Sequence, residues 1–519
     1  MPLRRAQPWL PALLAAALAV LYLVWNPLAP DLAAQVFRTD LFGRDGFALW
    51  NGQWFGGHHT LGYSVLFPPL AAALGPRLVG CLAAVASAIL FDRIARRHWG
   101  QDAWLGSLWF AASTATNLLI GRLTFTLGVA VGLAAVLALQ RDRRALAVGL
   151  AALCSLSSPV AGLFLGLAGV SLAALPDRRR DGLELAVSAV TPAAVLSLAF
   201  PDTGHQTFDA ITLWPILVYS AALVVLAPRS ERALRVGAVL YAVAAVASFV
   251  VDTPMGSNIA RLGTTFGPAV LACVLWPHRR WLLLALAPLL LFWQWKPTYN
   301  DLVKARDASA HASFYAPLVG FLSTHRDPPG RVEIVPTRTH WEVVHVSERF
   351  PIARGWERQL DTRFGPLFYD GALNAGTYRR WLDELGVRYV ALSDGPHDFA
   401  ARKEAKLVAR GLPYLREVWR RGHWRVYAVA APAALATGPL SVTRLGKQSV
   451  QLRAGRPGVG VVRVRWSPYW ELVRGSGCVE RGVDDLVRLR VRRAGELRLD
   501  FRFGFGRLFS RGARCSDEK

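Results

Sequence analysis

The chain has 519 residues, 53% of them hydrophobic, and carries 60 Lys and Arg against 36 Asp and Glu, a formal net charge of +24 at pH 7. The apolar residues form long runs within the first 296 positions, which excludes a single soluble domain. Most basic residues of this region stand in short clusters between the apolar runs. That pattern is typical of the cytoplasmic loops of multi-pass membrane proteins, so nucleic acid is not expected as a partner.

Eleven apolar segments are predicted to cross a membrane as helices. The first follows Arg4 and Arg5, is about 20 residues long, and has no small-residue cleavage site before Asp31, so we expect a retained span with its N-terminus inside. Basic clusters fall at every second connection, and Ser157-Ser158-Pro159 separates two short spans. Eleven crossings place everything after residue 296 outside. The predicted spans are 9–28, 72–92, 103–121, 123–140, 145–157, 159–175, 183–200, 211–227, 234–251, 262–277 and 281–295.

The first outside loop, residues 30–69, is predicted to be structured and is rich in carboxylates, histidines and aromatic side chains. A carboxylate at the outer end of a span can be held partly desolvated and accept a proton, and the position of Asp31 directly after the first span favours this role. Asp40 and Asp45 are the alternatives, although solvation or helix capping is the plainer reading for both. The other candidate residues of this loop, for contact with a donor or an acceptor, are His58, His59, Trp50, Trp54 and Tyr63.

Each of these side chains also has a structural interpretation. Trp and Tyr belong to the interface belt of any membrane protein, and paired histidines are commonly solvated or hydrogen-bonded. A divalent cation remains open as a cofactor, with Asp31 and His58 as its candidate ligands. Arg122 and Arg261, in other outer loops, suit a phosphate through their forked donors, or they extend toward lipid headgroups.

From residue 297 the pattern becomes that of a water-soluble region. Residues 297–430 mix short apolar strands, at 332–335, 387–392 and 424–429, with helical segments such as 377–385, which predicts an α/β domain. Residues 431–519 alternate polar and apolar side chains, which predicts a β-rich, sandwich-like domain. An outside location permits a disulfide between Cys478 and Cys515. No zinc-ligand spacing, Walker loop or GxGxxG before a helix occurs, which argues against a zinc site, an ATP-driven pump and a nucleotide-binding dehydrogenase.

Taken together, an acidic residue after the first span, a long outside loop, many spans and an outside C-terminal region resemble the GT-C superfamily of membrane glycosyltransferases. The segments PDLAAQ, WNGQWFGGHH, PMGSNIARLG and ARGWERQLDTRFGPLFY are similar to an actinobacterial branch related to the lipoteichoic-acid glycosyltransferase-like family, often labelled pyruvoyl-tetrahydropterin-synthase-related. A composition rich in Ala, Gly and Arg fits such a source.

The resemblance implies a polytopic GT-C-like protein that moves a sugar from a polyprenyl-phosphate donor to an anionic cell-envelope acceptor, glycan or lipid, with inversion, at the outer face of the cytoplasmic membrane. It assigns Asp31 as the base and Arg261 and Arg122 to the donor phosphate. Two other functions stay open: a lipid or glycan transporter or flippase, and a non-catalytic envelope assembly protein. The scarcity of ionisable residues inside the predicted spans weighs against transport.

Overall fold

The computed structural model describes residues 9–202, 204–325, 328–504 and 515. The expected role of Arg4 and Arg5 at the N-terminus lies outside these residues. The chain forms two compact units: a helical unit of Met1–Gly46 and Leu61–Arg306, and a C-terminal unit of Phe47–Thr60 and Asp307–Lys519. Part of the predicted first outside loop, 47–60, therefore belongs to the C-terminal unit.

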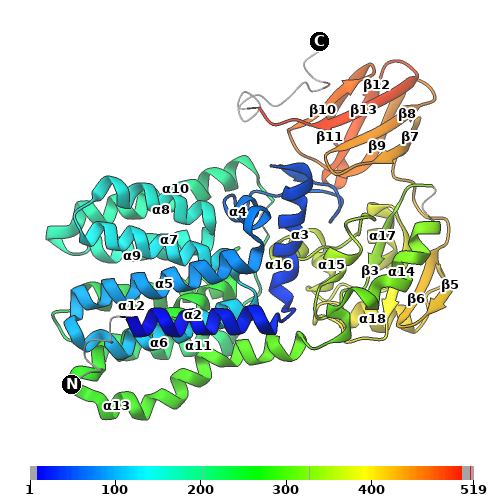
Figure 1. Ribbon diagram of the computed structural model, residues 1–519. Helices are drawn as coiled ribbons and strands as arrows, with labels where there is room; N and C mark the ends of the chain where they lie inside the picture. Colours follow the sequence, from blue (N-terminus) through cyan, green and yellow to red (C-terminus); the bar gives the residue numbers. More distant parts are fainter. Residues whose placement is uncertain (1–8, 203, 326–327, 505–514, 516–519) are drawn as a thin grey trace. The chain divides into compact units, whose positions relative to one another are not determined.

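The helical unit has a helix at each of the eleven predicted apolar segments (Figure 1). Segments 262–277 and 281–295 form one element, α13, whose backbone is non-helical at Arg279. The loop predicted at 30–69 also contains helices. The elements are α2 (Leu10–Trp25), α3 (Pro30–Asp45), α4 (Phe67–Leu74), α5 (Pro76–Trp99), η2 (Gly100–Ala103), α6 (Trp104–Ile120), α7 (Leu123–Gln140), α8 (Arg144–Ser157), α9 (Pro159–Ala173), η3 (Pro176–Arg178), α10 (Arg179–Ala199), α11 (Ala210–Leu226), α12 (Arg232–Val250), η4 (Gly256–Ile259) and α13 (Ala260–Lys304).

Small residues let these helices approach closely. A Cβ placed on Gly106 would lie 2.2 Å from the Cys273 sulfur, and one on Gly182 would lie 2.4 Å from the backbone nitrogen of Ala173. Close backbone approach at Gly and Ala is the usual packing of helices that share an apolar solvent. Glycine at these two positions therefore sets the spacing of α6 against α13 and of α10 against α9.

Five helical stretches within the described residues are long and apolar enough to cross a membrane, or six if the pair α2 and α3, bent by 80°, counts as one. Three further apolar helices, α8, α9 and α11, have 14, 15 and 17 residues. These counts rest on length and composition. Eleven crossings remain a prediction. The five stretches are Pro76–Ile120, Leu123–Gln140, Pro176–Ala199, Arg232–Val250 and Gly256–Lys304.

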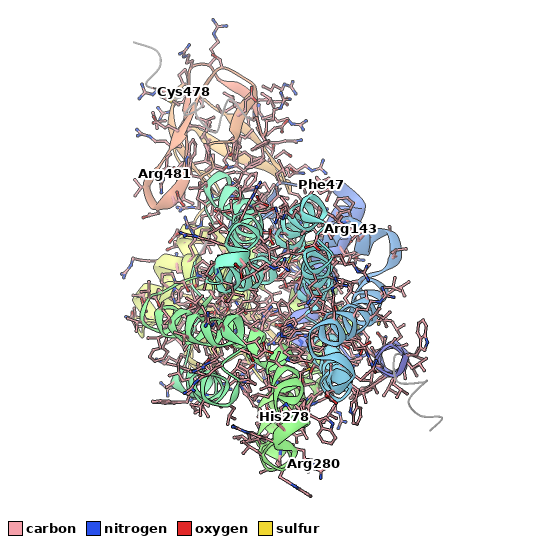
Figure 2. The ribbon with its side chains drawn as sticks, turned by 90° about the vertical axis from the view of Figure 1, so that its left-hand side faces the viewer. Phe47, Arg143, His278, Arg280, Cys478 and Arg481 are labelled. Atoms are coloured by element: carbon pink, nitrogen blue, oxygen red, sulfur yellow. A yellow bond between two sulfur atoms is a disulfide. The ribbon has the colours of Figure 1, made fainter. Side chains whose placement is uncertain are left out.

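Basic residues gather at one end of the helical unit. Figure 2 looks onto this end, where Arg143, His278 and Arg280 are labelled. An ion pair links two helices at this end, because Arg144 of α8 lies 2.7 Å from Asp181 of α10. The unit thus has one end marked by cations at alternate helix connections.

The C-terminal unit contains an α/β layer and a β-sandwich. The mixed sheet of the α/β layer has the order β3-β4-β6-β5, with β3 and β4 parallel and the other pairs antiparallel. Strands were expected at 332–335, 387–392 and 424–429, and all three are present. The elements are α14 (Ala312–Thr324), β3 (Arg331–Ile334), α15 (Glu342–His345), α16 (Arg358–Phe364), α17 (Ala375–Leu385), β4 (Val387–Ser393), α18 (Arg402–Ala409), β5 (Leu415–Arg421) and β6 (Trp424–Val429).

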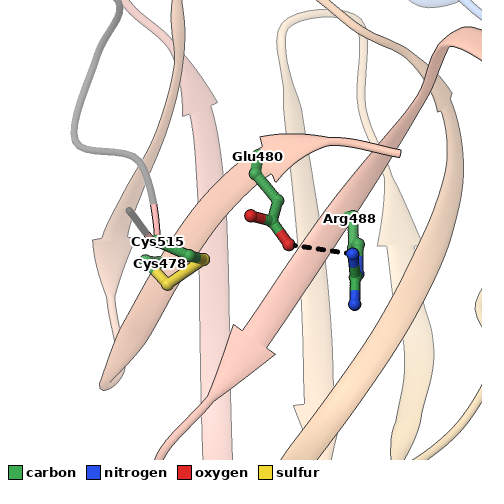
Figure 3. The surroundings of a disulfide bond; sticks show 4 residues. All are labelled: Cys478, Glu480, Arg488 and Cys515. Carbon is green, nitrogen blue, oxygen red and sulfur yellow. Dashed lines mark ion pairs between the residues drawn. A yellow bond between two sulfur atoms is a disulfide. The ribbon is translucent and has the colours of Figure 1, made fainter. Parts of the chain in front are cut away.

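Two antiparallel sheets build the sandwich, in the orders β10-β13-β8-β7 and β11-β12-β9. Burial alternates along β12 and β13, so apolar side chains face the interior and arginines face outward. Cys478 and Cys515 form a disulfide beside the Glu480–Arg488 ion pair (Figure 3). The strands are β7 (Leu440–Leu445), β8 (Ser449–Ala454), β9 (Gly458–Arg465), β10 (Trp470–Arg474), β11 (Gly477–Arg481), β12 (Leu486–Val491) and β13 (Gly495–Phe501).

Candidate functional site

Asp31 lies in the first turn of α3, which begins at Pro30. Proline suits the first position of a helix, and the positive end of the helix dipole stabilises a carboxylate there. The turn between α6 and α7 packs directly on this end: Gly121 has φ +88°, and a Cβ on it would lie 2.7 Å from the backbone nitrogen of Leu32. This approach brings Arg122 to Asp31, with Nε 3.4 Å from Oδ2.

Gln35, one turn further along α3, fixes this arrangement. Its Oε1 accepts a hydrogen bond of 3.0 Å from the Thr124 backbone N–H, and its Nε2 donates to the Gly121 carbonyl. The side chain is 1% exposed. Because a buried amide held by both of its ends has one orientation, α3 and the start of α7 are locked together around the Asp31–Arg122 pair.

Arg261 lies in the first turn of α13, within electrostatic range of Asp31, Arg122 and Tyr63. Its guanidinium carbon is 5.8 Å from the centre of the Phe125 ring, and its buried Nε has no hydrogen-bond partner among the described residues. A cation at a helix N-terminus is disfavoured by the helix dipole, and here no ion pair to a described residue offsets that cost. Arg261 therefore places a buried cation beside the Asp31–Arg122 pair.

Two charged residues that the sequence analysis did not select join this cluster. The halves of α13 fold back on each other at Arg279, as shown by the 2.8 Å hydrogen bond from Gln294 Nε2 to the Thr264 carbonyl. The return brings Asp301 within electrostatic range of Asp31 and Arg122. Lys304 Nζ is 2.8 Å from Asp301 Oδ1.

Asp301 and Lys304 were missed because they follow the last apolar segment and were assigned to the outside region. The near-equal lengths of apolar sequence before and after Arg279 are the signal that places residues near 261 and 300 together. With both included, the cluster holds three cations, Arg122, Arg261 and Lys304, against the carboxylates Asp31 and Asp301. A monoanionic phosphodiester would balance its charge.

Tyr63 borders the same cluster. The guanidinium carbon of Arg38 lies 4.1 Å from the centre of its ring. The following residues are anchored to the break between α8 and α9, because Ser64 Oγ donates to the Ser157 carbonyl at 2.7 Å and the Val65 N–H donates to the Leu156 carbonyl at 2.9 Å. Backbone carbonyls at this break therefore fix the segment that carries Tyr63.

The remaining carboxylates proposed in this region differ from Asp31 in their exposure. Asp40 and Asp45 are exposed on α3, whereas Asp31 is partly buried, with 29% of its side chain accessible. Exposure leaves a carboxylate solvated, which suits the capping or solvation alternative better than a desolvated base.

Trp50, Trp54, His58 and His59 do not form an open loop. They lie on and around the short hairpin of β1 (Trp50–Asn51) and β2 (His58–His59), and none is more than 6% exposed. Trp54 Nε1 donates to Ser347 Oγ at 2.9 Å, and its ring stacks on His58. The expected contact of these four residues with a donor or an acceptor is not compatible with this burial, because apolar packing inside the C-terminal unit encloses them.

The suggested divalent-cation site at Asp31 and His58 remains a prediction. Asp31 belongs to the helical unit and His58 to the C-terminal unit. Across the residues that the structure describes, no group of three or more His, Cys, Asp or Glu side chains is arranged to hold a metal ion.

A second charged cluster is buried in the C-terminal unit. Arg354 forms a two-fold contact with Asp361, at 2.9 and 2.7 Å, and donates to Glu404 Oε2 at 2.9 Å. Arg358 donates two hydrogen bonds to the carboxylate of Asp398, both of 2.9 Å. Burial would raise the pKa of Asp398, but Arg358 and His340 outweigh it and hold that pKa well below its usual range. All of these side chains are enclosed, which indicates a structural role.

No protein-family model matches the chain, and no curated protein is significantly similar to it.

Proposed function

We propose that this chain is an integral membrane glycosyltransferase. It would move a sugar from a polyprenyl-phosphate-linked donor to a cell-envelope acceptor on the outer face of the cytoplasmic membrane. The observation that carries this proposal is the position of Arg261, a guanidinium without an ion-pair partner among the described residues, in electrostatic range of the Asp31–Arg122 pair. A proton acceptor and an anion site are thereby combined within one charged cluster.

In the proposed reaction Asp31 accepts the proton of an acceptor hydroxyl. The hydroxyl oxygen forms a bond to the anomeric carbon of the sugar, and the bond from that carbon to the phosphate oxygen breaks on the opposite face. The phosphate leaves with the electron pair, and its second negative charge is stabilised by Arg261 and Arg122. One base is sufficient, and the configuration at the anomeric carbon inverts.

Two features of the helical unit support a location in the membrane. Five of its helical stretches are long and apolar enough to span a membrane, and its basic clusters mark alternate helix connections, which would face the cytoplasm. The charged cluster is built from the complementary helix ends: the start of α3, the α6–α7 turn and both ends of α13. A multi-pass arrangement with basic loops inside would present this cluster at the outer surface, where lipid-linked donors and envelope acceptors meet.

The proposal is tested with the purified full chain and radiolabelled polyprenyl-phosphate sugars, supplied with a crude envelope fraction as acceptor. Release of free polyprenyl phosphate together with label transfer to the envelope fraction is the expected result. If no donor turns over while vesicles containing the protein move the intact labelled lipid between leaflets, the chain is a transporter and the proposal is wrong.

A further inference from the structure

Three turns lie side by side at one end of the β-sandwich. They are residues 455–457, 475–476 and 492–494, and we call these turns, together with the flanking strand residues Arg453 and Arg474, the arginine end. The strand register sets their order, because Gly495 pairs with Ala454, Val491 pairs with both Gly458 and Gly477, and the Arg492 N–H donates to the Ser476 carbonyl at 2.9 Å. Each turn connects one sheet of the sandwich to the other.

The arginine end carries a concentrated positive charge. Its five arginines are all exposed, and Glu496 is the one acidic residue within the described segments 453–458, 474–477 and 491–496. Glu496 pairs with one of the five, at 3.1 Å, with both side chains 69% exposed, so this surface pair neutralises little. The arginines are Arg453, Arg456, Arg474, Arg492 and Arg493.

The spacing of these arginines indicates the length of the ligand. Neighbouring strands lie about 4.8 Å apart and packed sheets about 10 Å apart, so three adjoining turns that bridge two sheets spread their cations over roughly 10 Å in each direction. A single phosphate reaches one or two guanidinium groups at that spacing. A chain of repeated anionic groups reaches all five.

The composition of the turns indicates the kind of polyanion. Apart from the arginines they contain only Gly, Pro, Ser and Ala, with no aromatic or large aliphatic side chain to insert into a lipid bilayer. Every cation is an arginine, whose planar fork of donors matches phosphate oxygens in pairs. We propose that the arginine end is a binding surface for a linear, phosphate-rich polymer, separate from the charged cluster of the helical unit.

The test measures binding of long-chain polyphosphate to the full chain in neutral-lipid nanodiscs. With five contacts, affinity is expected to fall about 100-fold between about 50 and 200 mM salt, because each neutralised phosphate releases a counterion. In the triple variant Arg456→Gln, Arg492→Gln, Arg493→Gln, two contacts remain, and the fall is expected to shrink to about 7-fold.

A matched control removes the same number of charges from the other end of the sandwich, with Arg444→Gln, Arg481→Gln and Arg488→Gln. This variant is expected to keep the salt dependence of the unaltered protein. Equal losses in the two variants would show that net charge alone attracts the polymer and would overturn the proposal. Saturation by inorganic phosphate at the affinity of the polymer, or tighter binding to phosphatidylglycerol vesicles than to polyphosphate, would also overturn it. These readouts do not depend on glycosyl transfer.

Discussion

Replacement of Glu333 by Gln is expected to remove a pH dependence from the stability of the α/β layer. Glu333 lies on β3, is fully buried, and faces the carboxyl group of Glu404. Neither of its carboxyl oxygens has a hydrogen-bond donor among the described residues, whereas Glu404 accepts from Arg354 and from Tyr378. The proton of this carboxyl pair therefore resides on Glu333.

Burial, with the charge of Glu404 adding to it, raises the pKa of Glu333 well above its usual value. A group whose folded-state pKa lies above its unfolded value of about 4.3 stabilises the folded protein at low pH. This stabilisation is lost as pH rises toward the folded pKa. When one proton is bound only in the folded state, the free energy of unfolding falls by about 1.4 kcal/mol for each unit by which pH rises. Above the unfolded pKa the unfolding free energy should therefore fall with rising pH, at up to this rate, for as long as the pH stays below the folded pKa of Glu333.

Hydrogen exchange of peptides that cover β3 and α18, followed in the full chain, measures this local stability. In Glu333→Gln this pH-dependent contribution to stability disappears, because an amide does not titrate. The local unfolding free energy of the variant should therefore rise relative to that of the unaltered protein as pH increases. Glu348→Gln, the same change at an exposed position, is the matched control. His340, whose pKa is also raised because its bonds to Asp398 and Glu342 outweigh its burial, is present in all three proteins and cancels. Parallel pH profiles for Glu333→Gln and the unaltered protein would refute the reasoning.

Three further predictions concern other parts of the chain. Arg261→Gln should raise the KM for the lipid-linked donor by about 10- to 100-fold, since a charge-assisted contact contributes about 1.5–3 kcal/mol, and Arg261→Lys should recover part of it; steady-state kinetics decide, and an unchanged KM excludes Arg261 from the donor phosphate. Gly121→Ala should displace Leu32, lower kcat and also lower the unfolding temperature, because Ala is strained at a φ of +88° and its Cβ would lie 2.7 Å from the Leu32 backbone nitrogen; normal turnover would contradict the proposed packing of α3. Cys478→Ser should destabilise the sandwich by up to about 4 kcal/mol for its 37-residue separation from Cys515, measured by hydrogen exchange under oxidising conditions, and no loss would show that the bond is not formed.

Much of the fold follows from local sequence patterns. Every predicted apolar segment is helical, and the strands at 387–392 and 424–429 are present. Hydrophobic periodicity is a local property, and it is strong in long apolar runs and in alternating strands. The same patterns do not show how many of the helices cross a membrane, because segments such as 144–157 are too short for length to decide.

The site was harder to predict, because it depends on contacts between distant parts of the chain. Asp31, Arg122 and Arg261 were selected individually from their positions at span ends, and the structure brings them together. Asp301 joins them through the reversal of α13 at Arg279, which local patterns do not reveal.

The histidines and tryptophans of the first loop illustrate the opposite error. His58 and Trp54 have the residue types of a binding loop, but they pack inside the C-terminal unit. Nothing in the local sequence indicates that residues 47–60 join a domain that begins some 250 positions later. Aromatic side chains and histidines serve equally well in a core and in a binding site, so only tertiary contacts separate the two roles.

The most direct test of the central claim compares glycosyl transfer by Asp31→Asn and Asp40→Asn with transfer by the unaltered protein. The two substitutions make the same chemical change on one helix, at a partly buried and at an exposed position. Loss of the general base should lower kcat by about 10²- to 10⁴-fold in Asp31→Asn, with little change in Asp40→Asn. Full activity of a folded Asp31→Asn protein, or equal loss in both variants, would contradict the assignment of Asp31 as the base.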